Sequence, residues 1–188
     1  MTVLSLRDVE EVWTKALAAC PEIYQESAKD LLLDAIAMAG TNPTTMFVIK
    51  KIEANQVKPL RAASLIQSAL KSIRTPTEQL LTEFIKLVKQ WKNESALEKK
   101  HLLTSTMFQL SNVFYRAYVN PSTMVSNYPV RIYGIFGTKD STVLAQDYIN
   151  LLKEMLHAAK QANIKHTEFI VIAALGKLGH LDAAKPLM

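Results

Sequence analysis

Cysteine is almost absent from this sequence. Cys20 is the only one in 188 residues, so the chain can form neither an internal disulfide nor a metal site built from several cysteines. Cys20 lies in the segment KALAAC, whose apolar helical pattern predicts a small buried side chain rather than a reactive thiol.

Long apolar runs are also missing. No stretch of 18 apolar residues occurs, so no membrane-spanning helix is expected. The first residues, MTVLSLRDVEEVW, lack the basic and apolar regions of a signal peptide. At the other end, HLDAAKPLM begins a helical pattern that stops after about two turns, too few for a stable isolated helix. We therefore expect the chain to be a piece of a longer protein.

Catalytic and nucleotide-binding motifs are lacking as well. The glycine pairs in GIFGTKD (134–140) and GKLGH (176–180) follow no predicted strand, and neither has the Gly-Lys-Ser/Thr ending of a phosphate-binding loop. The four histidines show no spacing typical of metal ligands. No Ser/His/Asp grouping occurs on a recognisable nucleophile elbow. We expect no enzyme activity, no cofactor and no bound metal.

Helical periodicity, in contrast, runs through nearly the whole chain. One example is the segment after RTPT, where we expect Thr75 to cap a helix and Pro76 to occupy its first position. Its apolar residues then recur every three or four positions up to Trp91. The predicted helices cover residues 6–19, 23–39, 43–54, 57–73, 76–91, 97–118, 141–161 and 166–178, and a further one begins at 181.

Short polar breaks such as GTNP, NQVK and NIKH separate these helices, which makes sequential helices antiparallel neighbours. Helix pairs recur at roughly 35 to 45 residues, which is typical of an α-solenoid with two layers of helices. A glycine at each break, such as Gly40 or Gly179, is expected to take the left-handed conformation that closes a helix. A compact helical bundle is the structural alternative. Residues 119–140 read as a long ordered loop, in which PVRIYGIF is a possible strand.

Basic residues give the chain a net charge of +5 and favour an acidic partner. On a solenoid they could align as a stripe that attracts the phosphate headgroups of an anionic membrane, although an ordinary solvated surface is the alternative. Few aromatic residues alternate with them, which argues against nucleic acid. The candidate anion contacts are Lys50, Lys51, Lys58, Arg61, Lys71 and Arg74, and Lys86, Lys89 and Lys92 continue the pattern. Asn93, in the tripeptide NES, is a candidate glycosylation site if the parent protein is secreted.

Three segments in order carry a family resemblance. The stretch from LLLDAIAMAGTNPTTMFVIKKI through RTPTEQLL, the segment SNYPVRIYG and the segment ALGKLGH resemble the helical domain of the large lipid transfer proteins. The resemblance covers about residues 25–188, and SNYPVRIYG is most similar to insect-type vitellogenins, although the apolipophorin branch stays open. Many relatives carry a cysteine shortly after the Gly-Thr pair, whereas Thr44, Thr45 and Met46 stand there here. No family disulfide or catalytic residue is therefore carried over.

The resemblance implies a single helical domain over residues 1–188, within a large secreted lipoprotein. In this family the domain is a two-layered, right-handed superhelix of helix pairs. It wraps β-sheets that enclose a lipid cavity and touches an N-terminal β-barrel. The vitellogenin branch implies a yolk precursor that circulates in hemolymph, carries lipid and nutrients to oocytes, and meets a cell-surface receptor through other parts of the parent chain.

A second hypothesis comes from a different functional class. The lone cysteine and the missing signal peptide also suit a cytosolic HEAT-like solenoid that acts as a protein-interaction adaptor. The truncated last helix and the ordered family motifs count against it. A coding sequence that continues into β-rich segments on both sides would eliminate this hypothesis.

Overall fold

A computed structural model of the chain describes residues 4–73, 76–114 and 139–178. Within these ranges all the regular secondary structure is helical, which confirms the all-α prediction. The chain divides into two compact units, Met1–Pro76 and Thr77–Met188.

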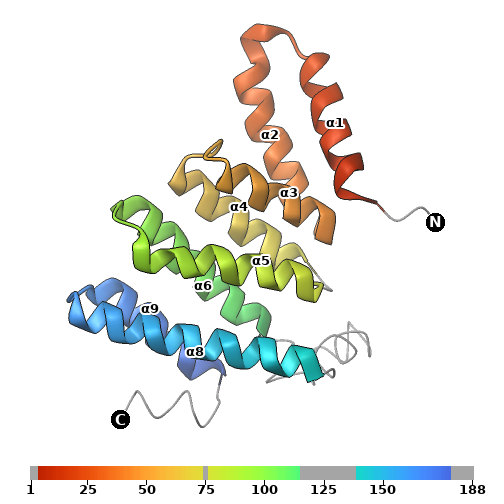
Figure 1. Cartoon of the computed structure of the whole chain (residues 1–188). Helices are drawn as coiled ribbons and strands as arrows, with labels where there is room; N and C mark the ends of the chain where they lie inside the picture. Colours follow the sequence, from red (N-terminus) through yellow and green to blue (C-terminus); the bar gives the residue numbers. More distant parts are fainter. Residues whose placement is uncertain (1–3, 74–75, 115–138, 179–188) are drawn as a thin grey trace. The chain divides into compact units, whose positions relative to one another are not determined.

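The first unit contains four α-helices. They are α1 (Leu6–Ala18), α2 (Gln25–Met38), α3 (Asn42–Glu53) and α4 (Pro59–Ser72), and the short 3-10 helix η1 (Glu22–Tyr24) precedes α2. Each helix packs on the next one along the chain, while α1 also packs on α3 and α2 on α4. The antiparallel pair α1–α2 is plain in Figure 1. The unit therefore has two layers, α1 with α3 and α2 with α4, as predicted for stacked helix pairs.

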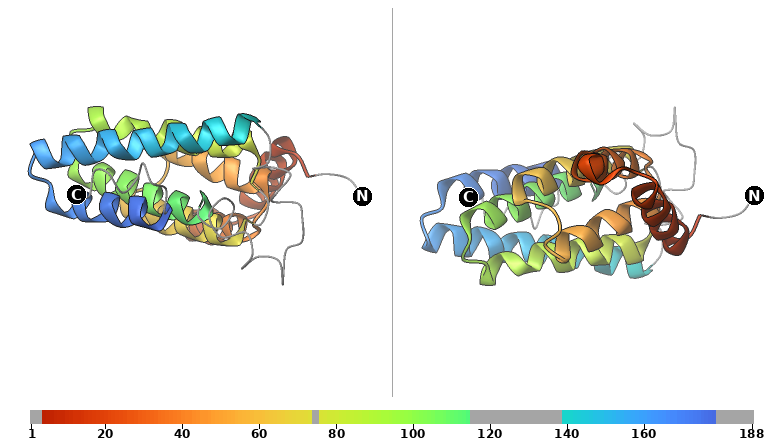
Figure 2. Two further views of the ribbon diagram at one scale, coloured as in Figure 1. Left: turned by 90° about the horizontal axis from the view of Figure 1, so that it is seen from below. Right: turned by 90° about the horizontal axis from the view of Figure 1, so that it is seen from above.

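The second unit repeats this arrangement. It contains α5 (Glu78–Lys89), the 3-10 helix η2 (Gln90–Asn93), α6 (Leu97–Phe114), α8 (Lys139–Gln161) and α9 (Lys165–Leu178). Helices α5 and α8 pack together in one layer and α6 and α9 in the other, and the pairs α5–α6 and α8–α9 join the layers (Figure 2).

Hydroxyl side chains cap the N-termini of α1, α3 and α5. Ser5 accepts a hydrogen bond from the Asp8 amide, and the Asp8 carboxylate accepts one from the Ser5 amide at 2.7 Å, which is a capping box. Thr41 and Thr44 form a similar box at the start of α3. The predicted start of α5 is wrong by two residues, because Thr77 rather than Thr75 caps it and Pro76 lies before the helix. The Thr77 side chain accepts from the Leu80 amide and thereby satisfies one of the free amides of the first turn.

The helix ends use two residue types. Gly40, after α2, has a φ of 65°, as predicted. The breaks after α3 and α8 contain no glycine, and Asn55 and Asn163, each with a φ of 54°, take the left-handed conformation there instead. Asparagine tolerates this conformation better than other side chains do, so the prediction of a glycine at every break is wrong.

The cores are formed by the inward stripes of the helices. In the first unit Phe47, Leu65 and Ile66 are almost completely buried, and in the second unit Phe84, Leu110 and Leu152 are. One expectation fails in the first unit. Cys20 is only partly buried, because α1 has already ended before it.

Some predictions fall outside the described residues. They include most of the loop 119–140, the possible strand PVRIYGIF, Arg74, Gly179 and the helix from 181. Residues 139 and 140 belong to α8, which begins earlier than expected.

Candidate functional site

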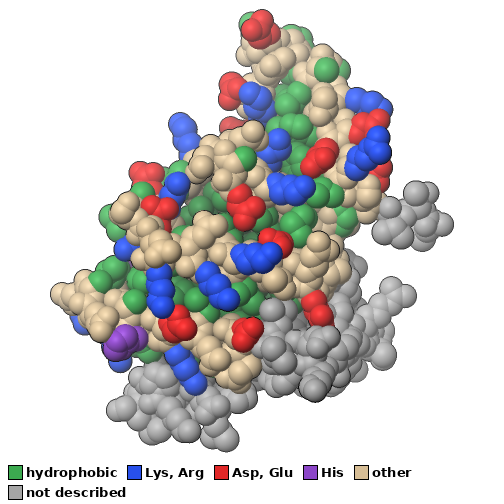
Figure 3. All heavy atoms as spheres, viewed as in Figure 1, with side chains coloured by type: hydrophobic (Ala, Val, Ile, Leu, Met, Phe, Trp, Pro, Cys, Tyr) green, Lys and Arg blue, Asp and Glu red, His purple; other side chains and the backbone are tan. Residues whose placement is uncertain are grey.

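The structure separates the predicted basic stripe into two groups. Lys50 and Lys51 lie in the last turn of α3, while Lys58 is the N-cap residue of α4 and Arg61 lies in its first turn, so these four lie around the α3–α4 connection. Lys71 lies in the last turn of α4, about 20 Å further along the helix axis. On the face of the first unit seen in Figure 3, basic and acidic side chains are interspersed rather than gathered in a basic band.

Carboxylates from α1 and α2 neutralise part of the first group. Lys50 Nζ lies 3.6 Å from Glu10 of α1. Arg61 Nη2 donates to the Asp34 carboxylate at 2.5 Å and to the Asp30 carbonyl at 3.1 Å, and its Nε lies 3.8 Å from the Asp30 carboxylate. The hydrogen bond to Asp34 raises the pKa of Arg61, which stays charged in any case. Arg61 therefore joins α4 to α2 and is not free for an external anion.

Lys51 is held in a different way. Its ammonium lies 5.1 Å from the ring centroid of Trp13 and 5.1 Å from that of Phe47. The two rings contact each other with centroids 5.4 Å apart. Electron-rich ring faces attract a cation within about 6 Å, so they stabilise the ammonium without neutralising it.

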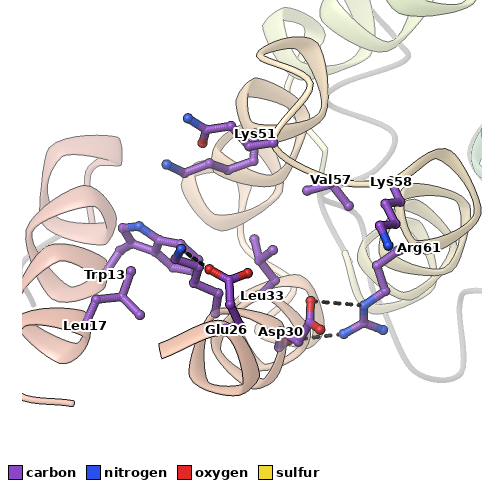
Figure 4. A pocket seen from close by; sticks show the side chains of 11 residues that line it. Trp13, Leu17, Glu26, Asp30, Leu33, Lys51, Val57, Lys58 and Arg61 are labelled. Carbon is purple, nitrogen blue, oxygen red and sulfur yellow. Dashed lines mark hydrogen bonds and ion pairs between the residues drawn. The ribbon is translucent and has the colours of Figure 1, made fainter. Parts of the chain in front are cut away.

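These residues surround a pocket of about 610 Å³ in the first unit (Figure 4). All four helices of the unit contribute to its wall. The apolar part comes from Trp13 and Leu17 of α1, Leu33 of α2 and Val57 of the α3–α4 connection. The polar part is Glu26, Lys29 and Asp30 of α2, Lys51 of α3, Gln56 and Lys58 of the connection, and Arg61 of α4.

A smaller hollow of about 290 Å³ adjoins the pocket. It shares Trp13, Lys51 and Gln56 with the pocket and adds the ion pair of Glu10 and Lys50 to its lining. Lys51 thus stands between the two hollows, and the larger one is the better candidate for a ligand because its volume lies within the usual range of about 300–1,000 Å³.

Of the residues that line the pocket, the pattern of basic residues in the sequence indicated only Lys51, Lys58 and Arg61. Among the residues that were missed, Trp13 had the clearest sequence signal for a pocket residue. It is a large side chain in a short amphipathic helix, and tryptophan is often only partly buried. Its approach to Lys51 depends on the packing of α1 on α3, which no local pattern encodes.

The second unit holds the remaining predicted residues. Lys86 pairs with Glu83 at 2.7 Å, Lys92 pairs with Glu154 at 2.7 Å, and Lys89 is exposed. Asn93 is exposed at the end of η2. His101 and His166 are in contact, with ring centroids 5.2 Å apart, but no cluster of three potential metal ligands occurs within the described ranges. Nor does any helix in those ranges have the length and apolar character needed to cross a membrane.

Comparison with known proteins gives one consistent family. The sequence model of the family described as the vitellogenin TPR domain matches residues 1–188. The vitellogenin of Anthonomus grandis is 28% identical over 175 residues, which are 92% of this chain and 10% of that protein. Vitellogenin-A1 of Aedes aegypti is 30% identical over 149 residues, which are 79% of this chain and 7% of that protein.

The chain thus spans about a tenth of the length of the curated relatives that it matches. No solved structure matches it significantly. The family model, however, covers every residue, and the relatives align across most of the two helical units described above. This chain therefore belongs to the vitellogenin TPR domain family.

Proposed function

We propose that this chain is a structural helical segment of a secreted, lipid-carrying yolk precursor. In this role the stacked helix pairs form a wall that packs against other domains of the parent protein, and those domains enclose most of the lipid. Support comes from the family and from the relatives' name, vitellogenin, together with the layered helix pairs of both units. The proposal assigns no catalytic step to the chain.

The observation that carries this proposal is an apolar side of α2 that faces away from its own unit. Leu31 and Met38 are 69% and 67% exposed, and Tyr24, at the N-cap of the helix, is 60% exposed. Their spacing of seven residues places all three on one side of the helix. A row of large exposed apolar side chains is typical of a surface that another part of the protein covers.

Immunoprecipitation from hemolymph and from yolk tests the proposal. An antibody against this chain should recover a polypeptide much larger than 21.0 kDa, together with bound phospholipid and neutral lipid. Recovery of a 21.0 kDa protein without lipid from cell lysates, and of nothing from hemolymph or yolk, would instead favour the adaptor hypothesis.

Contact of the basic residues with lipid headgroups is a separate part of the proposal. Among the candidate residues of the first unit, Lys58 and Lys71 are exposed and have no ion pair with another described residue, so they are the ones best placed to reach a flat anionic surface. The purified chain should co-sediment with anionic vesicles at low salt, but neither with zwitterionic vesicles nor at high salt. Equal sedimentation with both vesicle types would contradict headgroup recognition.

Glycosylation at Asn93 follows from the same proposal of secretion. Asn93 and Ser95 are both exposed, and the backbone at Glu94 is extended (φ −80°, ψ 129°), so the acceptor tripeptide is accessible. The chain secreted from insect cells should lose mass on treatment with a glycosidase specific for N-linked glycans, whereas Asn93→Gln should not. An unmodified secreted wild-type chain would refute this assignment.

A further inference from the structure

We propose that the pocket of the first unit binds one small amphipathic anion, an apolar body that carries a carboxylate or a phosphate monoester. The proposal goes beyond the structural role given above, since it concerns a single soluble ligand and does not depend on the bulk lipid of a parent protein. It rests on the shape of the pocket, its apolar wall and the distribution of its charges.

The apolar wall accounts for the body of the ligand. Leu33 is 5% exposed and forms part of the floor, while Trp13 and Leu17 line the side that belongs to α1. Figure 4 shows Trp13 and Leu17 on one side of the space and Leu33 on the α2 side. An apolar chain or ring between these residues would remove their remaining apolar surface from water.

The charges account for the head of the ligand. Four cationic and two anionic side chains line the pocket. The two carboxylates are already engaged, because Glu26 accepts from Lys29 at 2.5 Å and Asp30 lies beside Arg61. Lys51 and Lys58 have no carboxylate partner among the described residues, so the pocket keeps a positive excess.

Lys51 gives the pocket a positive charge at a fixed position. Most exposed lysines move freely and bind anions weakly, but the rings of Trp13 and Phe47 hold the Lys51 ammonium at one place in the wall. Because its position is fixed before a ligand arrives, little side-chain entropy is lost on binding. Gln56 adds an amide that can donate a hydrogen bond to the same head group.

Calorimetry with the 188-residue chain tests the proposal, using decyl phosphate and decanoate below their micelle concentrations as probes. We expect saturable binding of one molecule per chain, and the two probes separate a phosphate source from a carboxylate source. Decanol has no charge, decyltrimethylammonium has the opposite charge, and inorganic phosphate has no apolar body. Each of these three compounds should therefore bind at least about tenfold more weakly than the better probe. Equal binding of decanol would overturn the anion assignment.

Matched variants locate the site. The double variant Lys51→Gln/Lys58→Gln should weaken the better probe about tenfold or more. Lys71→Gln removes the same charge from the far end of α4 and should leave its affinity unchanged. Circular dichroism and the denaturation midpoint confirm that each variant is folded. If the double variant and Lys71→Gln weaken binding equally, or if neither does, the pocket is not the site.

The variants also separate this proposal from the headgroup proposal. Loss of vesicle sedimentation in Lys71→Gln, with intact binding of the soluble probe, would support two distinct anion contacts. Failure of the wild-type chain to bind either probe would refute the pocket proposal, whatever the vesicles or the hemolymph experiment show.

Discussion

The buried hydroxyl group of Tyr148 connects two helices in the core of the second unit. Tyr148 of α8 is fully buried, and its hydroxyl donates to the Met107 carbonyl of α6 at 2.5 Å and lies 2.7 Å from Ser111 Oγ. Its ring stacks on Phe114 with centroids 4.7 Å apart. Burial raises the pKa of Tyr148 above its ordinary value of 10.0, and the hydrogen bond with Ser111 offsets this only in part. The unit therefore requires the neutral phenol.

We predict that this requirement makes the chain sensitive to alkali. A group whose pKa is raised in the folded state contributes its full stability below its unfolded pKa, here near 10.0, and loses it as the pH rises above that value. Each pH unit in this window should cost about 1.4 kcal/mol. Tyr148→Phe should cost about 1 kcal/mol near neutral pH, through the lost hydrogen bond, and should remove this part of the alkaline loss. Urea denaturation of both proteins at about pH 8 and pH 11 measures the difference.

The difference between the two proteins at each pH is the informative quantity, because every other effect of alkali on the chain is common to both. An identical alkaline loss in Tyr148→Phe and in the wild type would show that Tyr148 is not responsible.

Arg61 gives a second prediction for a single residue. Its guanidinium bonds a carboxylate and a carbonyl of α2 at once, which a lysine ammonium cannot reproduce with the same geometry. Arg61→Lys should therefore destabilise the first unit, by about 0.5–1 kcal/mol because the pair is partly exposed to solvent. Asp34→Asn should cost a similar amount, and the double variant less than the sum. Additive losses would show that the two side chains do not interact.

The turn between α2 and α3 is tightly constrained. Gly40 combines a φ of 65° with a close approach to α4, because a Cβ placed on it would lie 2.5 Å from the Ser72 carbonyl oxygen. A backbone atom cannot move away as a flexible side chain can. The turn therefore fixes how α2 lies against the end of α4.

Gly40→Ala should destabilise the first unit by about 2–4 kcal/mol, from the strained φ together with the steric clash. Gly176→Ala is the matched control, since Gly176 lies inside α9 and an added Cβ meets no atom within 4 Å. It should stabilise the chain by about 0.5–1 kcal/mol, because alanine is the better helix former. Thermal and urea denaturation of both variants gives the two signs, and a neutral Gly40→Ala would contradict the close approach.

At this scale most of the helices could be predicted from the sequence. The contacts between helices that are distant in the chain could not be predicted. Apolar periodicity is a local property, so α3, α4 and α9 lie within two residues of their expected bounds. The predicted basic stripe depended instead on what α1 and α2 place beside α3 and α4. Glu10 and Asp34 neutralise two of its members, and Trp13 fixes a third. None of these contacts follows from the spacing of the basic residues alone.

For the whole molecule, the division into two compact units permits a direct test of the expected single domain. Each unit contains one tryptophan, Trp13 in the first and Trp91 in the second, so fluorescence can follow each unit separately. We predict that Gly40→Ala lowers the denaturation midpoint reported by Trp13 more than the midpoint reported by Trp91. The measurement uses Trp91→Phe and Trp13→Phe backgrounds to isolate each signal. Equal shifts in both reporters would instead show one cooperative domain.

The layered packing also has a consequence for biosynthesis. In the first unit the main contacts join each helix to the next one and to the next but one, so its contact order is low. Each helix from α2 onward therefore finds at least one of its partners among segments that have already left the ribosome. The first unit can close its core once residue 76 has emerged, before the second unit exists. While the first unit is being made, its newest helix and the exposed apolar side of α2 are therefore the surfaces most open to aggregation and to chaperones.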